Sequence, residues 1–376
     1  MPPRIRRRVA LVGLGIGRQH AAAYRELADR FEIAAVCGLN VEQARAAAAE
    51  YGARHVLTDF EQVLALPDID VVDICTPPHL HASQALAALA AGKHVICEKP
   101  IAADLAAIDR LLDAERASGR TLMPIFQYRF GSGLQTLLEL QRRGFAGSPL
   151  LASVEVHWRR RAAYYDVPWR GRIATEYGGV LTSQSIHAID ALLCAFGDVN
   201  RVSAFANTSV NAVEVEDCAV VNLQMRSGAL AVISATLGSA AEVSRHRFVF
   251  RGLVAESNTR AYSNCDGPWT FTADDPAAAP ALADAVAEIE RSFARAPAAG
   301  SDDAASRLKG YVPPAGFAPQ FAQFADALDA GEAPPVTLAD ARRATELLAA
   351  VYHSAAQGAV VELPLQREHP AYHRFS

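Results

Sequence analysis

Strand-like apolar segments alternate with helix-like segments throughout the first third of the chain, and this alternation constrains the fold more than any other feature. Continuous apolar strands joined by amphipathic helices predict a parallel sheet that is covered on both faces, as in an α/β domain. The expected strands are residues 9–14, 31–37, 55–58, 71–75, 94–97 and 121–127, and the expected helices are residues 18–30, 41–51, 60–66, 80–91 and 104–118.

A glycine-rich turn follows the first expected strand. Gly13, Gly15 and Gly17 lie between the apolar run and the first helix, one residue tighter than the G-x-G-x-x-G spacing. Glycine permits positive φ and lets a phosphate approach the backbone. Backbone N–H groups at a helix N-terminus then bind the pyrophosphate. Glycine turns are common between strands and helices, so this turn is weak evidence alone, but it lies where such sheets bind ligands.

The pattern changes after residue 127 and predicts a second, α+β domain with a largely antiparallel sheet. The expected helices are residues 134–143, 179–196, 282–295, 317–330 and 338–357, and the expected strands are residues 150–159, several within 202–250, and 359–363. A hairpin is expected to turn at Ser227–Gly228.

Composition excludes several classes of protein. The net charge is −5 without a concentrated basic face, so nucleic acid is not an expected partner. No apolar run is long enough to span a membrane, and a strand rather than a signal-peptide segment follows the basic residues 1–8. The six cysteines form no C-x-x-C pair. We therefore expect reduced thiols, a cytoplasmic location and no metal site.

Lys99 is the first candidate for chemistry. The tripeptide Glu98-Lys99-Pro100 closes the fifth expected strand, and lysine occurs only at positions 93, 99 and 309 of an arginine-rich chain. A lysine can shift its pKa or direct a hydrogen bond onto a hydroxyl, whereas arginine keeps its proton. The alternative is an ordinary surface lysine at a strand end.

His187 is the second candidate. If residues 179–196 form one helix, Ser183, His187 and Asp190 share a face, because they lie four and then three residues apart. A histidine facing a pocket exchanges protons near neutral pH. The alternative is a histidine that satisfies a buried hydrogen bond. We expect Asp190 to orient or cap rather than react.

Four motifs then occur in a defined order along the chain. They are Gly13-x-Gly15-x-Gly17-x-x-His20, Thr76-Pro77-Pro78-x-x-His81, Glu98-Lys99-Pro100 and Gly178-Gly179…His187-x-x-Asp190. With these motifs the sequence resembles the glucose–fructose oxidoreductase / inositol dehydrogenase / rhizopine catabolism (Gfo/Idh/MocA) family over nearly its whole length. The Glu-Lys-Pro strand end combined with the later Gly-Gly segment is the more specific part of the resemblance.

The resemblance implies the architecture and the activity. It implies a Rossmann-type NAD(P)-binding domain over residues 1–125 and an α+β domain over residues 126–376, whose large open sheet holds substrate and oligomer contacts. A homodimer or homotetramer is expected. The implied reaction moves a hydride between NAD(P) and a hydroxyl carbon of a sugar, cyclitol or related polyol.

The resemblance also implies the site residues. Lys99 and His187 serve the reacting hydroxyl, and Ser183 stands where many members have an aspartate, so Ser183 acts only by hydrogen bonding. The implied cofactor-binding residues are Gly13, Gly15, Ile16, Gly17, Gly38, Asn40, Thr76, Pro77, His81, Glu98, Lys99, Gln127, Trp169 and Arg170. The implied substrate residues are Lys99, Arg129, Tyr165, Arg170, Gln184 and His187.

The cofactor and the exact reaction stay open at this stage. The turn Gly38-Leu39-Asn40 has no carboxylate for the adenine ribose, which mildly favours NADP. Arg18 or Arg45 are candidates for a 2′-phosphate, although Asn40 suits a plain ribose equally. One alternative function is the NAD-dependent glycosidase activity found in the family. The other is a non-catalytic sugar or nucleotide sensor, against which the retention of both Lys99 and His187 argues.

Overall fold

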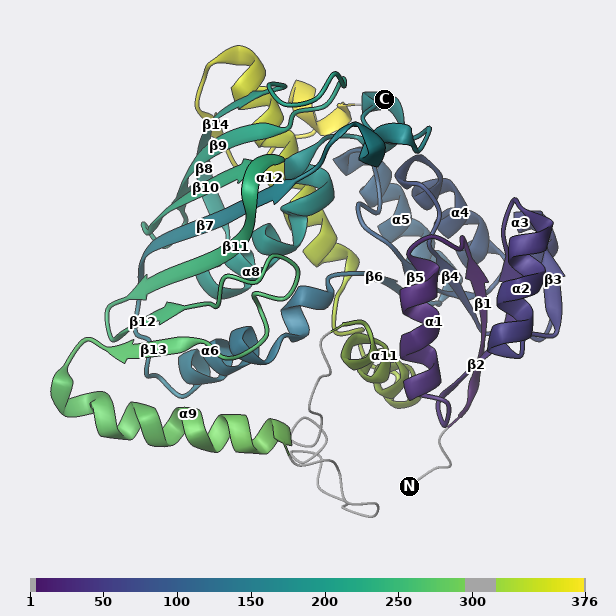
Figure 1. Ribbon diagram of the computed structural model, residues 1–376, viewed down its shortest axis with the longest axis horizontal. Coiled ribbons are helices and arrows are strands. Elements are labelled where there is room, and N and C mark those ends of the chain that lie inside the picture. The colour runs from purple at the N-terminus through teal and green to yellow at the C-terminus, as the bar shows by residue number, and fades with distance from the viewer. Residues whose placement is uncertain (1–4, 295–315, 375–376) are drawn as a thin grey trace. The chain divides into compact units, whose positions relative to one another are not determined.

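The computed structural model describes residues 5–294 and 316–374 of the 376-residue chain. These residues belong to two compact units, which Figure 1 shows together and which we describe separately. The first unit comprises Met1–Phe126, Gln320–Thr345 and Tyr372–Ser376, and the second comprises Gln127–Pro319 and Glu346–Ala371. The basic N-terminal tail lies partly outside the described residues, because residues 1–4 are not among them.

The first unit is built on a six-stranded sheet in which every pairing is parallel. Its strand order is β3-β2-β1-β4-β5-β6, the order of a Rossmann fold. The strands are β1 (Arg7–Val12), β2 (Phe31–Cys37), β3 (His55–Leu57), β4 (Val71–Ile74), β5 (His94–Cys97) and β6 (Leu122–Pro124). Residues 71–74 of β4 are entirely buried, as expected for a sheet covered on both faces. The predicted α/β class is confirmed.

Helices connect these strands, and local sequence signals set their ends. They are α1 (Gly17–Glu26), α2 (Val41–Tyr51), α3 (Phe60–Leu64), α4 (Pro78–Ala90) and α5 (Leu105–Ser118). The Asn40 side chain caps α2 and Gly52 ends it in the left-handed region, which explains why the range 41–51 was predictable. A later helix, α11 (Ala318–Ala330), lies beside α1 in Figure 1, where the Phe321 ring stacks on Tyr24 at 4.7 Å.

The second unit is built on an eight-stranded sheet in the order β13-β12-β11-β7-β10-β9-β8-β14. Its strands are β7 (Pro149–Arg159), β8 (Val199–Asn207), β9 (Cys218–Met225), β10 (Leu230–Thr236), β11 (Gly238–Phe250), β12 (Leu253–Glu256), β13 (Thr270–Ala273) and β14 (Val361–Glu362). Only β7 and β10 pair in parallel among these neighbours. The largely antiparallel sheet is confirmed, and so is the hairpin at Ser227–Gly228 between β9 and β10.

Among the described residues, helices cover one face of this sheet, and several side chains on the other face are exposed. The unit's helices are α6 (Ser132–Arg142), α7 (Ile173–Glu176), α8 (Ile186–Phe196), α9 (Ala279–Ala294) and the later part of α12 (Leu338–Gln357). In Figure 1, α6 and α8 lie on the same side of the strands. Alternate residues of β7, including Val154, Val156 and Trp158, are buried. The expected helix over residues 282–295 is α9, and residue 295 lies outside the described part.

The single helix expected over residues 179–196 is wrong in one respect. A π-helical turn, Val180–Gln184, precedes α8, and the segment of residues 173–184 that contains this turn is bent by 54° from residues 186–196. The cause is a side chain distant in sequence, because the Glu216 carboxylate accepts the backbone N–H groups of Gly179 at 2.8 Å and Leu181 at 2.9 Å. These contacts hold the turn open before α8 begins.

In the part of the chain that the structure describes, no single helix is long and apolar enough to cross a membrane, although the bent pair 173–184 and 186–196 reaches that length and composition jointly.

Candidate active site

The glycine turn leaves room for a ligand at the N-terminus of α1. Gly13 has φ +96°, and a Cβ there would lie 2.4 Å from the carbonyl oxygen of Cys75. A Cβ at Gly15 would meet nothing within 4 Å. In the described residues no side chain caps α1, which begins at Gly17 after the N-cap residue Ile16. An uncapped helix N-terminus with an open glycine beside it suits a pyrophosphate, although the spacing is one residue shorter than usual.

A Gly15→Ala variant tests this fit. The added methyl group points into open space, so we expect the thermal midpoint to stay close to that of the wild type. The same methyl group occupies the approach of a phosphate, so we expect NAD(H) to bind at least about tenfold more weakly, a loss of about 1.4 kcal/mol. Calorimetric titration measures this binding. Unchanged binding would separate Gly15 from the dinucleotide site.

The end of β2 carries no carboxylate within residues 38–40. The Asn40 side chain accepts the Gln43 N–H at 3.0 Å and so serves as the cap of α2. Arg45 forms an exposed ion pair with Glu42, whose Oε1 lies 3.0 Å from its guanidinium. Arg18 is exposed near the start of α1. The predicted contacts of Gly38 and Asn40 with the cofactor stay predictions.

His81 connects the two loops that follow β4 and β5. Its ring nitrogens lie 2.7 Å from the carbonyl oxygen of Thr76 and 2.8 Å from that of Pro100. Burial lowers the pKa of His81, which favours the neutral ring. His81 therefore fixes the position of the Thr76–Pro77 segment relative to the Lys99–Pro100 turn. Its predicted contact with the cofactor stays a prediction.

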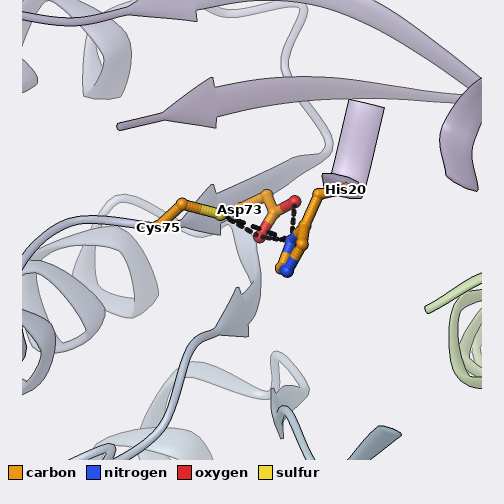
Figure 2. Close-up of side chains that lie close together, drawn as sticks. All are labelled: His20, Asp73 and Cys75. Atoms are coloured by element: carbon orange, nitrogen blue, oxygen red, sulfur yellow. Dashed lines mark hydrogen bonds and ion pairs between the residues drawn. The ribbon is translucent and has the colours of Figure 1, made fainter. Parts of the chain in front are cut away.

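His20, Asp73 and Cys75 lie close together (Figure 2) and form the centre of a buried network that reaches Glu98, the residue before Lys99. His20 on α1 contacts Asp73 on β4, with Nδ1 2.9 Å from the carboxylate. Its other nitrogen lies 3.2 Å from Oε1 of Glu98, and Oε2 of Glu98 accepts the Lys99 backbone N–H at 3.0 Å. Tyr24 donates its hydroxyl hydrogen to Asp73 at 2.9 Å. Glu98, predicted to line the cofactor, thus also anchors the turn that carries Lys99.

The charge on His20 holds this network together. Burial by itself lowers the pKa of an imidazole, but the Asp73 carboxylate and the Cys75 sulfur outweigh burial and raise the pKa of His20 well above its usual range. An imidazolium donates from both nitrogens, and both face carboxylates here. His20, Asp73 and Cys75 also have donor atoms within 4.8 Å of one another, as in a metal site. We interpret them as a hydrogen-bonded network, because Tyr24 and Glu98 complete it.

Lys99 lies half-buried at the end of β5, which is two strands from β1 in the sheet. The Lys99–Pro100 peptide bond is cis. The strand order therefore places Lys99 on the same edge of the sheet as the glycine turn, because parallel strands end together.

In the second unit, His187 is buried near the start of α8. Its ring stacks on Tyr128, with the ring centroids 4.7 Å apart, and its exposed fraction is 4%. The neighbouring Asp190 accepts two hydrogen bonds from Arg129, at 2.6 and 3.1 Å. Asp190 therefore orients Arg129, and the prediction that Asp190 does not itself react stays a prediction. The predicted contact of Arg129 with substrate stays a prediction.

Ser183 makes a contact that the sequence did not indicate. Its hydroxyl donates to Oε1 of Glu176 at 2.7 Å. Glu176 also accepts the Gly171 N–H at 2.6 Å and lies 3.6 Å from the guanidinium of Arg170. Glu176 was missed because nothing in its spacing distinguishes it from a surface glutamate. The only available signal was the lack of a carboxylate at position 183.

Arg170 is held between aromatic rings. Its guanidinium carbon lies 4.1 Å from the Tyr164 ring centroid and 4.3 Å from that of Trp169, and it also hydrogen-bonds the Tyr164 hydroxyl. Gln184 donates to the same hydroxyl at 3.0 Å. These contacts connect two residues predicted for the substrate, Arg170 and Gln184, through Tyr164.

Three buried polar atoms of predicted site residues find no hydrogen-bond partner among the described residues. They are Oε1 of Gln127, the hydroxyl of Tyr165 and Oε1 of Gln184. A buried polar atom without a partner is costly, so such atoms commonly meet a ligand or water. All three lie in the second unit, which the sequence assigned to substrate binding.

Comparison with known proteins agrees with both halves of this description. Residues 7–126 match the description "Oxidoreductase family, NAD-binding Rossmann fold", and residues 134–253 match "GFO/IDH/MocA C-terminal domain". D-apiose dehydrogenase of Paraburkholderia graminis is 30% identical over 231 residues, which cover 61% of this chain and 60% of that protein. D-glucoside 3-dehydrogenase of Escherichia coli is 33% identical over 195 residues, or 50% of this chain and 54% of that protein. The chain thus spans 54–60% of the length of these curated relatives.

A solved structure extends the likeness to most of the chain. The WlbA dehydrogenase from Bordetella pertussis, in complex with NADH and UDP-GlcNAcA, is 26% identical. It superimposes with a TM-score of 0.81 over 96% of this chain and 99% of that one. The paired Rossmann and C-terminal matches confirm the resemblance seen in the sequence motifs, and the chain belongs to the Gfo/Idh/MocA family of oxidoreductases.

Proposed function

We propose that this protein is an NAD(P)-dependent dehydrogenase or reductase that acts on a CH–OH group of a sugar, cyclitol or related polyol. The observation that carries the proposal is the position of Lys99. It follows β5 on the edge of a Rossmann sheet that also carries the open glycine turn after β1. Relatives whose names give sugar or cyclitol dehydrogenases support the substrate class.

The family resemblance implies that Lys99 and His187 both serve the reacting hydroxyl, and we propose a separate role for each of them. When bound, the nicotinamide supplies the hydride acceptor or donor. In the oxidation direction His187 takes the hydroxyl proton, because an imidazole exchanges protons near neutral pH. Lys99 donates a hydrogen bond to the same oxygen and stabilises the negative charge that develops there. Tyr128 fixes the plane of the His187 ring by stacking.

For the cofactor we propose a preference for NADP over NAD. The turn at residues 38–40 contains no carboxylate to repel a 2′-phosphate, and Arg18 is exposed at the start of α1. The NADH complex of the WlbA dehydrogenase makes NAD the competing choice. Titration with both reduced cofactors decides between them. A lower Kd for NADH would refute the preference.

A panel of sugars and cyclitols, assayed with NAD and with NADP, tests the proposed activity. We expect nicotinamide absorbance to change with at least one polyol. Release of a free sugar with no change in absorbance would instead support the glycosidase alternative. Cofactor binding without turnover of any polyol in the panel would support a non-catalytic sensor.

We also propose that the exposed face of the second sheet binds a second copy of the chain. Phe205, Val220, Leu230 and Leu151 are exposed, and the strand register places them on one face. Exposed apolar side chains that share one sheet face commonly mark a contact surface, and in a symmetric dimer such a surface is self-complementary. The expected state is a homodimer, or a homotetramer that includes this interface.

A Phe205→Asp variant tests this interface. Phe205 is 72% exposed in the single chain, so the substitution costs little in the isolated subunit. A charge buried between two copies has no partner, so we expect the variant to elute as a smaller species. Light scattering coupled to size-exclusion chromatography gives the mass. An unchanged mass for Phe205→Asp would contradict the interface.

A further inference from the structure

Ser183 stands where many family members have an aspartate, and its hydroxyl contacts the carboxylate of another residue, Glu176. It donates to Oε1 of Glu176 at 2.7 Å. A hydroxyl–carboxylate hydrogen bond is charge-assisted and among the stronger ones in proteins. The negative charge that the substitution removes from position 183 is therefore present one hydrogen bond away.

The backbone brings Glu176 to this position. Glu176 is the last residue of α7, and the next residue, Tyr177, has φ +68°. The left-handed region is costly for a residue with a side chain and turns the chain sharply. The turn brings the segment that begins at Gly179 back alongside α7, so that Ser183 reaches Glu176. The left-handed Tyr177 thus lies at the turn that allows Ser183 to reach Glu176.

The surroundings of Glu176 compensate for its burial. Its side chain is 2% exposed, and a carboxylate so buried needs donors or an opposite charge. The Gly171 N–H supplies a bond at 2.6 Å, and Arg170 supplies a guanidinium at 3.6 Å. Arg170 is in turn fixed by the rings of Tyr164 and Trp169. These contacts stabilise the charged form of the buried Glu176 side chain.

We propose that Glu176 is a positioning residue that supplies, through Ser183, the negative charge that an aspartate supplies in other family members. The inference rests on the proposed dehydrogenase function. Ser183 lies four residues before His187, and because its hydrogen is directed at Glu176, the lone pairs of its oxygen are left to accept a hydrogen bond from His187 or from the substrate. Negative charge there stabilises the imidazolium that forms when His187 takes the substrate proton.

The pH profile of kcat/KM in the oxidation direction tests the proposal. Glu176→Gln removes the charge and keeps an acceptor for Gly171. Without the charge His187 is a weaker base, so the acidic limb of the profile moves to lower pH by about one unit and the plateau falls about tenfold. A double variant, Glu176→Gln with Ser183→Asp, returns the charge to the position found in relatives. We expect this double variant to return the acidic limb to its wild-type pH and to recover most of the plateau value of kcat/KM.

Two further variants make the test decisive. Glu214 is an exposed carboxylate that accepts the Ile173 N–H at the start of the same helix, at 3.0 Å. Glu214→Gln is therefore the matched control, and its profile should coincide with that of the wild type. If Glu176→Gln does not fold, Ser183→Ala takes its place, since it removes the connection to the site and leaves Glu176 in its surroundings.

The outcomes separate this inference from the proposed function. A wild-type protein that turns over no polyol refutes the dehydrogenase function, and the inference fails with it. If the wild-type enzyme is active but Glu176→Gln leaves the acidic limb of the kcat/KM profile at the same pH, only the inference is refuted. The added Ser183→Asp substitution would then also leave kcat/KM unchanged. A shifted limb that the double variant restores supports it, because a purely structural role would not move the profile.

Discussion

Replacing His187 with alanine should lower turnover by about 10²–10⁴-fold, the range expected when a general base is removed. The reason is that His187 is the group to which we assign the substrate proton. Dinucleotide binding should stay unchanged, because the glycine turn lies in the other unit of the chain. Initial rates and a cofactor titration on the same preparation measure both effects.

His353→Ala is the control for this variant. His353 is a half-buried histidine of α12 that packs against His369, with ring centroids 4.6 Å apart, and it has no place in the proposed site. We expect it to keep its turnover. Full turnover by His187→Ala would remove His187 from the mechanism, and loss of cofactor binding would point to a structural role instead.

Replacing His20 with leucine should lower the free energy of unfolding by about 3–5 kcal/mol near neutral pH, the usual effect of removing one partner of a buried ion pair. The substitution approximately keeps the volume of the side chain but removes the imidazolium that contacts the carboxylates of Asp73 and Glu98. Denaturant unfolding of both proteins gives the difference. A change within about 0.5 kcal/mol, typical of surface positions, would contradict the charged network.

The pH dependence of the free energy of unfolding also tests whether His20 is charged in the folded protein, because it predicts the sign of the change with pH. The pKa of His20 is raised in the folded protein, so its contribution is complete below the unfolded pKa of about 6.5. It is lost as the pH rises through the folded value, because the folded imidazole then releases its proton. We therefore expect the difference between wild type and His20→Leu to narrow with increasing pH. A difference that widens with pH would have the wrong sign.

The fold was largely predictable because burial dictates its pattern. Strands buried on both faces must be apolar throughout, and β2 and β5 occupy the residues that the sequence predicted. The range of α2 was predictable because Asn40 and Gly52 are local signals for its two ends. The start of β1 was less predictable, because the strand begins at Arg7, a polar residue that hydrophobic periodicity alone assigns to the N-terminal tail.

What the sequence could not predict depends on contacts between distant residues. The break before α8 arises from Glu216, which is 37 residues from Gly179 along the chain. The network under Lys99 joins His20 to residues 53 and 78 positions away. Glu176 is only seven residues from Ser183, but the left-handed Tyr177 between them gives no signal in composition or period. These features follow from the folded backbone and not from local propensity.

Transfer of deuterium is the most direct test of the central claim. The carbonyl compound formed from the polyol identified in the panel would be reduced with a reduced nicotinamide cofactor that carries deuterium at both C4 positions, and the sugar product would be analysed by mass spectrometry. The account predicts that the label moves to one carbon of the sugar during turnover by the wild-type protein. Turnover in which the cofactor keeps all of its deuterium would contradict it.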